Sequence, residues 1–116
     1  HAYEASLGYS KKLNHGEAVI LGIKTAIKFS LQNNYIKKKE YNSIINHIEN
    51  SNLPSKIENF FTYKSINKII SYMKKDKKNS SNKVNLILLK KIGSATINNQ
   101  FNTKILKSFL KKELKN

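Results

Sequence analysis

Apolar side chains recur along most of this chain at the spacing of an amphipathic helix. Between Asn14 and Gln32 they return every three or four residues, which predicts a long helix with one buried face. The expected positions on that face are Ile20, Ile23, Ile27 and Leu31. Gly22 lies inside this segment, and we expect it to mark a close crossing with another helix.

Three further segments show the same spacing, and a short helix over residues 1–7 ends at Gly8. Residues 37–40 lead into a helix that stops before Asn52, while Ser65 and Asn102 are expected to cap two more. Their expected buried positions are Tyr41, Ile44, Ile45 and Ile48, then Ile66, Ile69, Ile70 and Met73, then Ile105, Leu106, Phe109, Leu110 and Leu114.

Residues 84–89 follow a different period, because apolar side chains occupy almost every position of a short run. This pattern predicts a largely buried strand, which Ile92 and Gly93 turn into a short partner over residues 95–98. An isolated hairpin is marginally stable in water, so it is expected to lie on the helices. The chain is therefore expected to form one mainly α domain with a small β-hairpin.

The high positive charge of the chain suggests an alternative function. The formal net charge is +15, as in a basic nucleic-acid-binding helical module. All 22 basic residues are lysine, however, whereas arginine is preferred for bidentate contacts with phosphate and guanine. The lysines occur in every segment, as a compositional bias predicts, so we expect no nucleic-acid partner. No apolar run approaches the roughly 20 residues of a membrane span, so no membrane partner is expected either.

Candidate chemistry lies at the starts of two predicted helices. Asn14 and Glu17 fit a capping box, which places His15 at the first helical position. Free N–H groups and the positive end of the helix dipole disfavour an imidazolium there, and metals bind the neutral ring. Gly16 leaves room for a close ligand. His1 lies 14 residues before His15, so the two can meet only by chain reversal.

Both histidines could equally be ordinary polar residues at helix starts, since two histidines without cysteine are too few ligands for a closed zinc site. His47 is interpreted as a surface residue of its helix. The lysines over residues 74–78 are typical of a solvated helix end.

A resemblance to known sequences favours the functional interpretation of the two histidines over the interpretation as ordinary polar residues. Residues 1–5 read HAYEA and residues 8–26 read GYSKKLNHGEAVILGIKTA, which is similar to GHxxGHAxE and GYGxxLHGEAVxxGM of the 3-dehydroquinate synthase family. Further matches follow in the same order. Residues 52–54 occupy the place of GLP, residues 73–78 match MxxDKK, and residues 84–93 resemble a strand that ends in an IG turn.

The resemblance implies a fold and a reaction. Residues 1–116 would form the C-terminal helical, metal- and substrate-binding domain, whereas the NAD-binding domain and two of the three metal ligands would lie upstream. The intact enzyme would convert 3-deoxy-D-arabino-heptulosonate 7-phosphate to 3-dehydroquinate and phosphate in the shikimate pathway. It would use NAD and Zn²⁺ or Co²⁺.

The resemblance also implies residue roles. His15 would ligate the metal, and His1 would be a catalytic group that hydrogen-bonds or relays a proton near the substrate. Lys77 would be both catalytic and substrate-binding, holding an anionic oxygen, with Lys78 as a weaker second substrate contact. The partner would be a small phosphorylated sugar acid, and the full-length enzyme would be a cytoplasmic homodimer. This fragment alone is expected to be inactive. Another sugar-phosphate cyclase on the same scaffold is the nearest alternative.

Overall fold

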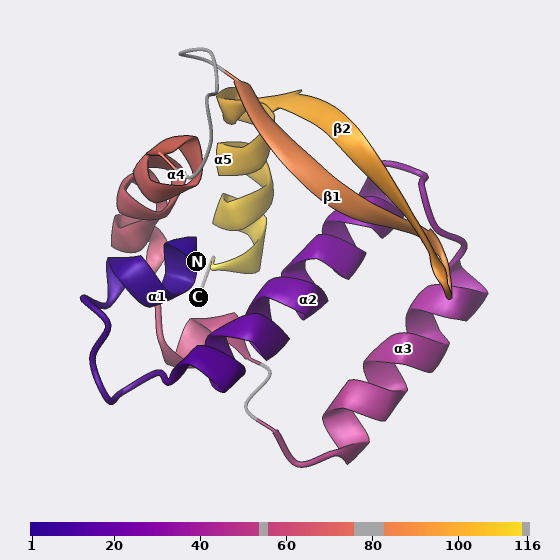
Figure 1. Ribbon diagram of the computed structural model, residues 1–116, viewed down its shortest axis with the longest axis horizontal. Helices are drawn as coiled ribbons and strands as arrows, with labels where there is room; N and C mark the ends of the chain where they lie inside the picture. The colour runs from indigo at the N-terminus through magenta and orange to yellow at the C-terminus, as the bar shows by residue number, and fades with distance from the viewer. Residues whose placement is uncertain (54–55, 76–82, 115–116) are drawn as a thin grey trace.

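The computed structural model of the chain describes residues 1–53, 56–75 and 83–114. Over these residues the fold is mainly α-helical with one antiparallel hairpin, which confirms the expected fold class (Figure 1). The elements are α1 Ala2–Ser6, α2 His15–Gln32, α3 Lys38–Asn50, η1 Ile57–Asn59, η2 Tyr63–Ser65, α4 Ile66–Lys75, β1 Lys83–Lys91, β2 Ser94–Asn102 and α5 Thr103–Glu113.

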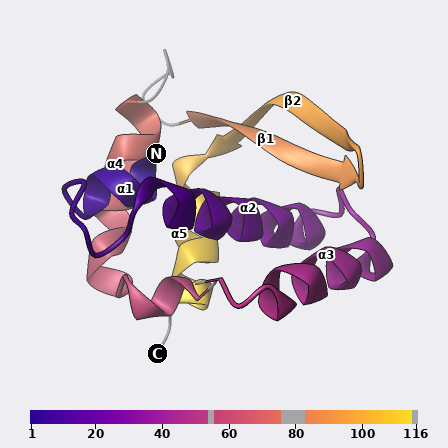
Figure 2. The same cartoon turned by 60° about the horizontal axis from the view of Figure 1, so that its bottom comes forward.

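The longest helix, α2, runs through the middle of the domain. In Figure 1, α3 lies on one side of α2, and α1, α4 and α5 lie on the other. Figure 2 shows the hairpin as a separate layer that covers α2. This packing is expected, because an isolated hairpin is only marginally stable in water. Within the described ranges, none of the helices has both the length and the apolar character needed to cross a bilayer.

The buried face of α2 differs from the expected stripe. Leu21 and Phe29 are 1% and 3% exposed and belong to the main core, whereas Ile23 is 44% exposed. Ile27 is buried as expected, but it lies outside the main core cluster. Because α2 contacts α1 and β1 as well as α3, its buried surface is wider than one stripe.

The expectation for Gly22 is wrong. A Cβ atom built at this position would meet nothing within 4 Å, so no neighbouring helix requires a glycine there. Ser65 directly precedes α4 and is the last residue of η2, where its hydroxyl accepts from Thr62 N at 3.4 Å. The Thr62 side chain caps that 3₁₀ turn by accepting from Lys64 N. The chain therefore enters α4 directly from η2.

Several helix ends are confirmed. Gly8 follows α1 with φ of +66°, a left-handed conformation that glycine adopts without the steric cost of a Cβ. Asn34, with φ of +62°, and Asn52, with φ of +60°, follow α2 and α3. The Asn102 side chain accepts from Lys104 N and caps α5.

The hairpin is longer than predicted, because β2 extends from Ser94 to Asn102 and pairs with β1 with two register shifts, between Leu86 and Leu88 and between Leu89 and Lys91. Val84 and Leu88 are 2% exposed, whereas Ile87 is 60% exposed on the outer face. The expected burial of the strand is thus correct for one face only. On α5, similarly, Ile105 is 47% exposed, while its other expected core positions are buried.

Two contacts of α2 attach the hairpin to the helices. Phe29 makes edge-to-face contacts with Phe101 of β2 and Phe109 of α5, with ring centroids 4.8 and 5.1 Å apart. Ser30 is 0% exposed, and its hydroxyl accepts a hydrogen bond from Leu89 N of β1 at 3.1 Å. The same hydroxyl donates to Ala26 O at 2.7 Å. The strand is therefore fixed on the C-terminal half of α2.

Candidate functional site

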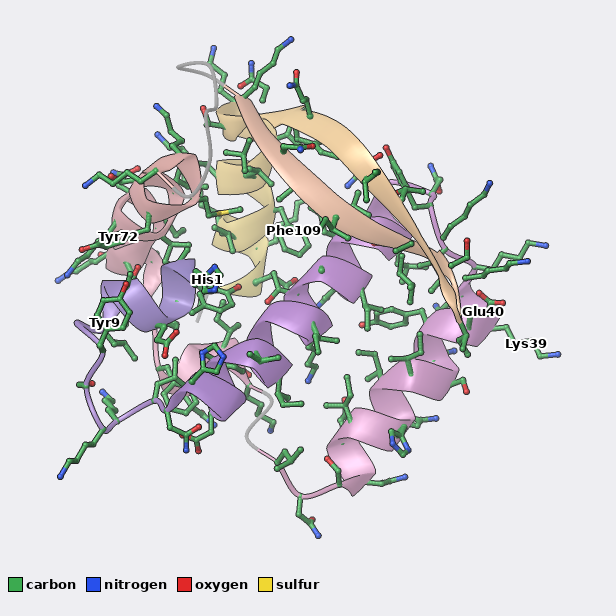
Figure 3. The ribbon with its side chains drawn as sticks, in the orientation of Figure 1. His1, Tyr9, Lys39, Glu40, Tyr72 and Phe109 are labelled. Carbon is green, nitrogen blue, oxygen red and sulfur yellow. The ribbon has the colours of Figure 1, made fainter. Side chains whose placement is uncertain are left out.

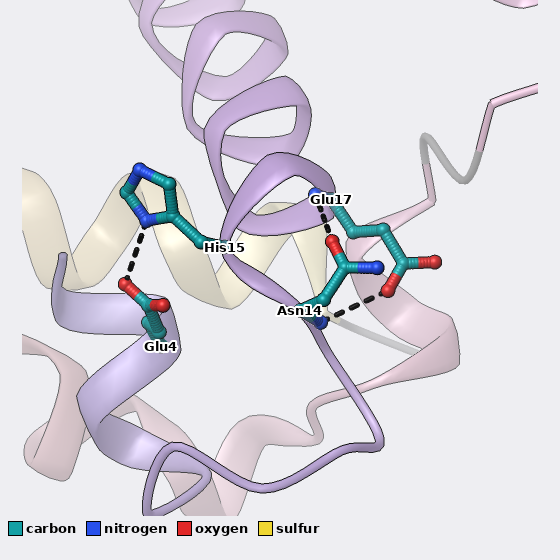
Figure 4. A network of polar contacts seen from close by, with 4 residues as sticks. All are labelled: Glu4, Asn14, His15 and Glu17. Carbon is teal, nitrogen blue, oxygen red and sulfur yellow. Dashed lines mark hydrogen bonds and ion pairs between the residues drawn. The ribbon is translucent and has the colours of Figure 1, made fainter.

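His15 is the first residue of α2, as the sequence predicts. Asn14 Oδ1 accepts from Glu17 N at 2.8 Å, and Glu17 Oε1 accepts from Asn14 N at 2.9 Å, so the capping box is complete (Figure 4). These two bonds satisfy backbone donors at the helix start and fix the backbone that carries the imidazole. The His15 side chain is 67% exposed, so one side of the ring is open to solvent.

A carboxylate of α1 contacts this ring. His15 Nδ1 lies 3.1 Å from Glu4 Oε1, and the Glu4 side chain is only 15% exposed (Figure 4). Since a carboxylate only accepts hydrogen bonds, this contact is satisfied when Nδ1 carries the proton. The other ring nitrogen, Nε2, then has a free lone pair. A histidine held in this way is a suitable metal ligand, because metal-bound histidines usually donate their second nitrogen to a carboxylate or carbonyl.

One imidazole does not make a metal centre. Within the described residues there is no group of three or more His, Cys, Asp or Glu side chains placed to hold a metal ion. Structural and catalytic zinc sites use three or four protein ligands. The described part of this chain therefore holds one imidazole oriented by a carboxylate, and a zinc site would need further ligands from elsewhere.

His1 lies at the N-terminal end of α1 and is exposed (Figure 3). It also lines a cavity of about 240 Å³, bounded mainly by apolar side chains of α2, α4, β1 and α5. Glu4 follows one turn later in the same helix and contacts His15, so the chain reversal brings the starts of α1 and α2 together. Lys77 and Lys78 lie outside the described residues.

Tyr3, which precedes Glu4 in α1, anchors α1 on α2. Its hydroxyl and the Thr25 hydroxyl are 2.7 Å apart, and its ring packs on Phe61 with centroids 5.2 Å apart. Burial raises the pKa of the Tyr3 phenol well above its ordinary value, and the hydrogen bond to Thr25 opposes this only in part. The phenol therefore stays protonated, and α1 is held against α2 beside His15.

Two other positions were singled out from the sequence. A Cβ atom at Gly16 would meet only Asn14 Oδ1, at 3.6 Å, so the helix start is open on that side. His47 is exposed on α3, which confirms its interpretation as a surface residue.

The sequence alone does not mark Glu4 or Asn85 as site residues. Glu4 lies in the first turn of α1 and in the HAYEA segment, but only the folded chain shows which histidine it faces. Asn85 Oδ1 is a buried acceptor that has no hydrogen-bond partner among the described residues, and its residue lines the same cavity as His1. No signal in the strand pattern marks that position.

The chain is similar to known proteins over most of its length. The family model described as 3-dehydroquinate synthase C-terminal matches residues 1–79. The chain belongs to the 3-dehydroquinate synthase family. This assignment covers α1, α2 and the Glu4–His15 contact, so the candidate site lies in the matched region.

Relatives in the 3-dehydroquinate synthase family match almost the whole chain. It is 57% identical to the 3-dehydroquinate synthase of Pelagibacter ubique over 98% of its own length and 31% of that relative. The enzyme of Zymomonas mobilis is 33% identical, over 95% of this chain and 29% of the relative. The enzyme of Thermoanaerobacter pseudethanolicus is 35% identical, over 92% of this chain and 29% of the relative. The chain thus spans less than a third of these relatives, and no solved structure matches it.

Proposed function

We propose that this chain is the C-terminal part of an enzyme that converts 3-deoxy-D-arabino-heptulosonate 7-phosphate to 3-dehydroquinate and phosphate. Membership in the 3-dehydroquinate synthase family and the similarity to enzymes of that name support the reaction. The observation that carries the proposal is the contact of His15 Nδ1 with Glu4 Oε1, because it leaves Nε2 available on an exposed ring. His15 would hold a divalent metal through this nitrogen, and zinc or cobalt suits an imidazole ligand.

Bound NAD would supply transient oxidation of a secondary alcohol, and the bound metal would polarise the oxygen of that alcohol. The residues of this chain would prepare for that chemistry. His15 would present Nε2 to the metal from the exposed start of α2. His1, at the start of α1, would donate a hydrogen bond to the substrate or relay its proton. Lys77 would bind an anionic oxygen of the substrate, with Lys78 as a second contact.

The main test compares substrates on the complete enzyme. We expect phosphate release and dehydroquinate formation with the heptulosonate phosphate, and no turnover of glucose 6-phosphate or sedoheptulose 7-phosphate. Turnover of either of the last two would instead favour another sugar-phosphate cyclase on this scaffold. The 116 residues alone should give no product, because a single ligand cannot offset the dehydration of a zinc ion. Product from the isolated 116 residues would contradict the proposed division of the site.

A further inference from the structure

We propose that Glu4 is a positioning residue that sets the tautomer and orientation of His15 for metal binding. This inference rests on the proposed function, since it concerns the same metal. Glu4 itself would not bind the ion. Its carboxylate would accept a hydrogen bond from Nδ1–H of His15 and so direct the Nε2 lone pair outward.

The exposure of His15 is the reason that such a residue is needed. A ring that is 67% exposed has few packing contacts to restrict its torsion angles. The proton of a neutral imidazole can also sit on either nitrogen. A carboxylate 3.1 Å from Nδ1 favours one ring orientation and one tautomer, and it makes the ring a stronger electron donor to a metal.

Glu4 is itself held in place, which distinguishes it from a mobile surface carboxylate. Its side chain is 15% exposed, and the adjacent Tyr3 is bonded to Thr25 of α2. Thr25 lies ten residues after His15, which is about 15 Å along a helix. Neighbouring residues of α1 therefore contact α2 at two separated points, and this arrangement restricts rotation of α1 relative to α2.

A second carboxylate at the same helix start provides the matched control. Glu17 lies two residues after His15, but its Oε1 accepts from Asn14 N in the capping box. Figure 4 shows its carboxylate on the other side of the helix start from the His15 ring. Glu17→Gln removes the same charge as Glu4→Gln, and the glutamine oxygen can still accept the capping bond.

The test is titration of the metal-free complete enzyme with Co²⁺, followed by competition with Zn²⁺. We expect Glu4→Ala to weaken metal binding about 10–100-fold, the range for outer-shell partners of metal ligands. Glu4→Gln should lose less metal affinity than Glu4→Ala, because the glutamine amide oxygen can still accept a hydrogen bond from Nδ1–H of His15. Glu17→Gln should bind metal as the wild type does. Circular dichroism should show that all of these variants keep their helix content.

A spectroscopic measurement separates orientation from folding. In metal-free enzyme with ¹⁵N-labelled histidine, long-range ¹H–¹⁵N spectra should show His15 with its proton on Nδ1. In Glu4→Ala the proton should move toward Nε2. A merely structural role for Glu4 would leave the tautomer of His15 unchanged.

The outcomes separate this inference from the proposed function. If His15→Ala loses the metal while Glu4→Ala binds it normally, the role of Glu4 is wrong and the proposed function stands. If Glu4→Ala loses as much affinity as His15→Ala, Glu4 is a ligand, which also overturns the inference. If His15→Ala binds metal as the wild type does, the metal site of the proposed function fails as well.

Discussion

The two ends of α2 make different use of polar side chains. At the N-terminal end, His15 meets Glu4 of α1 with its ring 67% exposed. At the C-terminal end, Ser30 meets Leu89 N of β1 and is 0% exposed. Both contacts join segments that are distant in the sequence. Exposure distinguishes a polar group that can still bind a ligand from one whose hydrogen-bonding capacity is used within the fold.

Removing His15 should have the largest effect on function and little effect on stability. We expect His15→Ala to lower kcat/KM of the complete enzyme by more than about 100-fold, beyond the range for outer-shell residues. The unfolding midpoint should change little, because the ring is mostly exposed. His47→Ala, on the exposed face of α3, is the matched control and should keep wild-type activity. Equal activities of the two variants would remove the functional distinction between the ends of α2.

Removing the Ser30 hydroxyl should give the opposite pattern. Ser30→Ala leaves Leu89 N without its acceptor in a partly buried position, which should cost about 1 kcal/mol of unfolding free energy. Urea denaturation measures this loss, and metal affinity should not change. Ser43→Ala on the exposed surface of α3 is the control. A loss no larger than that of Ser43→Ala would show that the buried contact does not stabilise the fold.

Removing the N-cap of α2 should have a moderate effect on stability. Asn14→Ala breaks the capping box and should lower the unfolding free energy by about 1 kcal/mol. Asn46→Ala, exposed within α3, should have a smaller effect because it caps no helix. Thermal melts of both variants make the comparison. Equal shifts in the two midpoints would contradict a stabilising role for the capping box.

The anchor of α1 predicts a small, pH-dependent effect. At neutral pH, Tyr3→Phe loses the bond to Thr25, worth about 0.5–1.5 kcal/mol. The pKa of Tyr3 is raised by burial, so the wild-type unfolded state releases a proton near pH 10 that the folded state keeps. The stabilisation is complete below that pH and is lost as the pH rises above it. The difference from Tyr3→Phe should therefore narrow above pH 10. Tyr63→Phe, at a side chain that is 66% exposed, is the control and should change the unfolding free energy little at neutral pH.

The sequence predicts most of the helices because their signals are local. The capping box of Asn14 and Glu17, the left-handed Gly8 and the cap at Asn102 each depend on a few adjacent residues, and all three are confirmed. Burial is less predictable, since it depends on which elements cover a helix. Ile23 belongs to the predicted stripe yet is exposed, because the surface of α2 that packs on the core is centred elsewhere.

In the candidate site, too, local features could be predicted from the sequence and a long-range contact could not. His15 could be selected from its place at a helix start and from the resemblance to a family. Its partner could not, because the contact with Glu4 joins two helices across a loop. Local patterns therefore select the proposed ligand, and tertiary structure selects the residue that we propose orients it.

The most direct measurement is anomalous X-ray diffraction from crystals of the complete enzyme containing zinc. We predict an anomalous peak about 2.0–2.1 Å from His15 Nε2, with Nδ1 still against the Glu4 carboxylate. A zinc peak bound to His15 Nδ1, or a bound zinc ion far from this ring, would contradict the account.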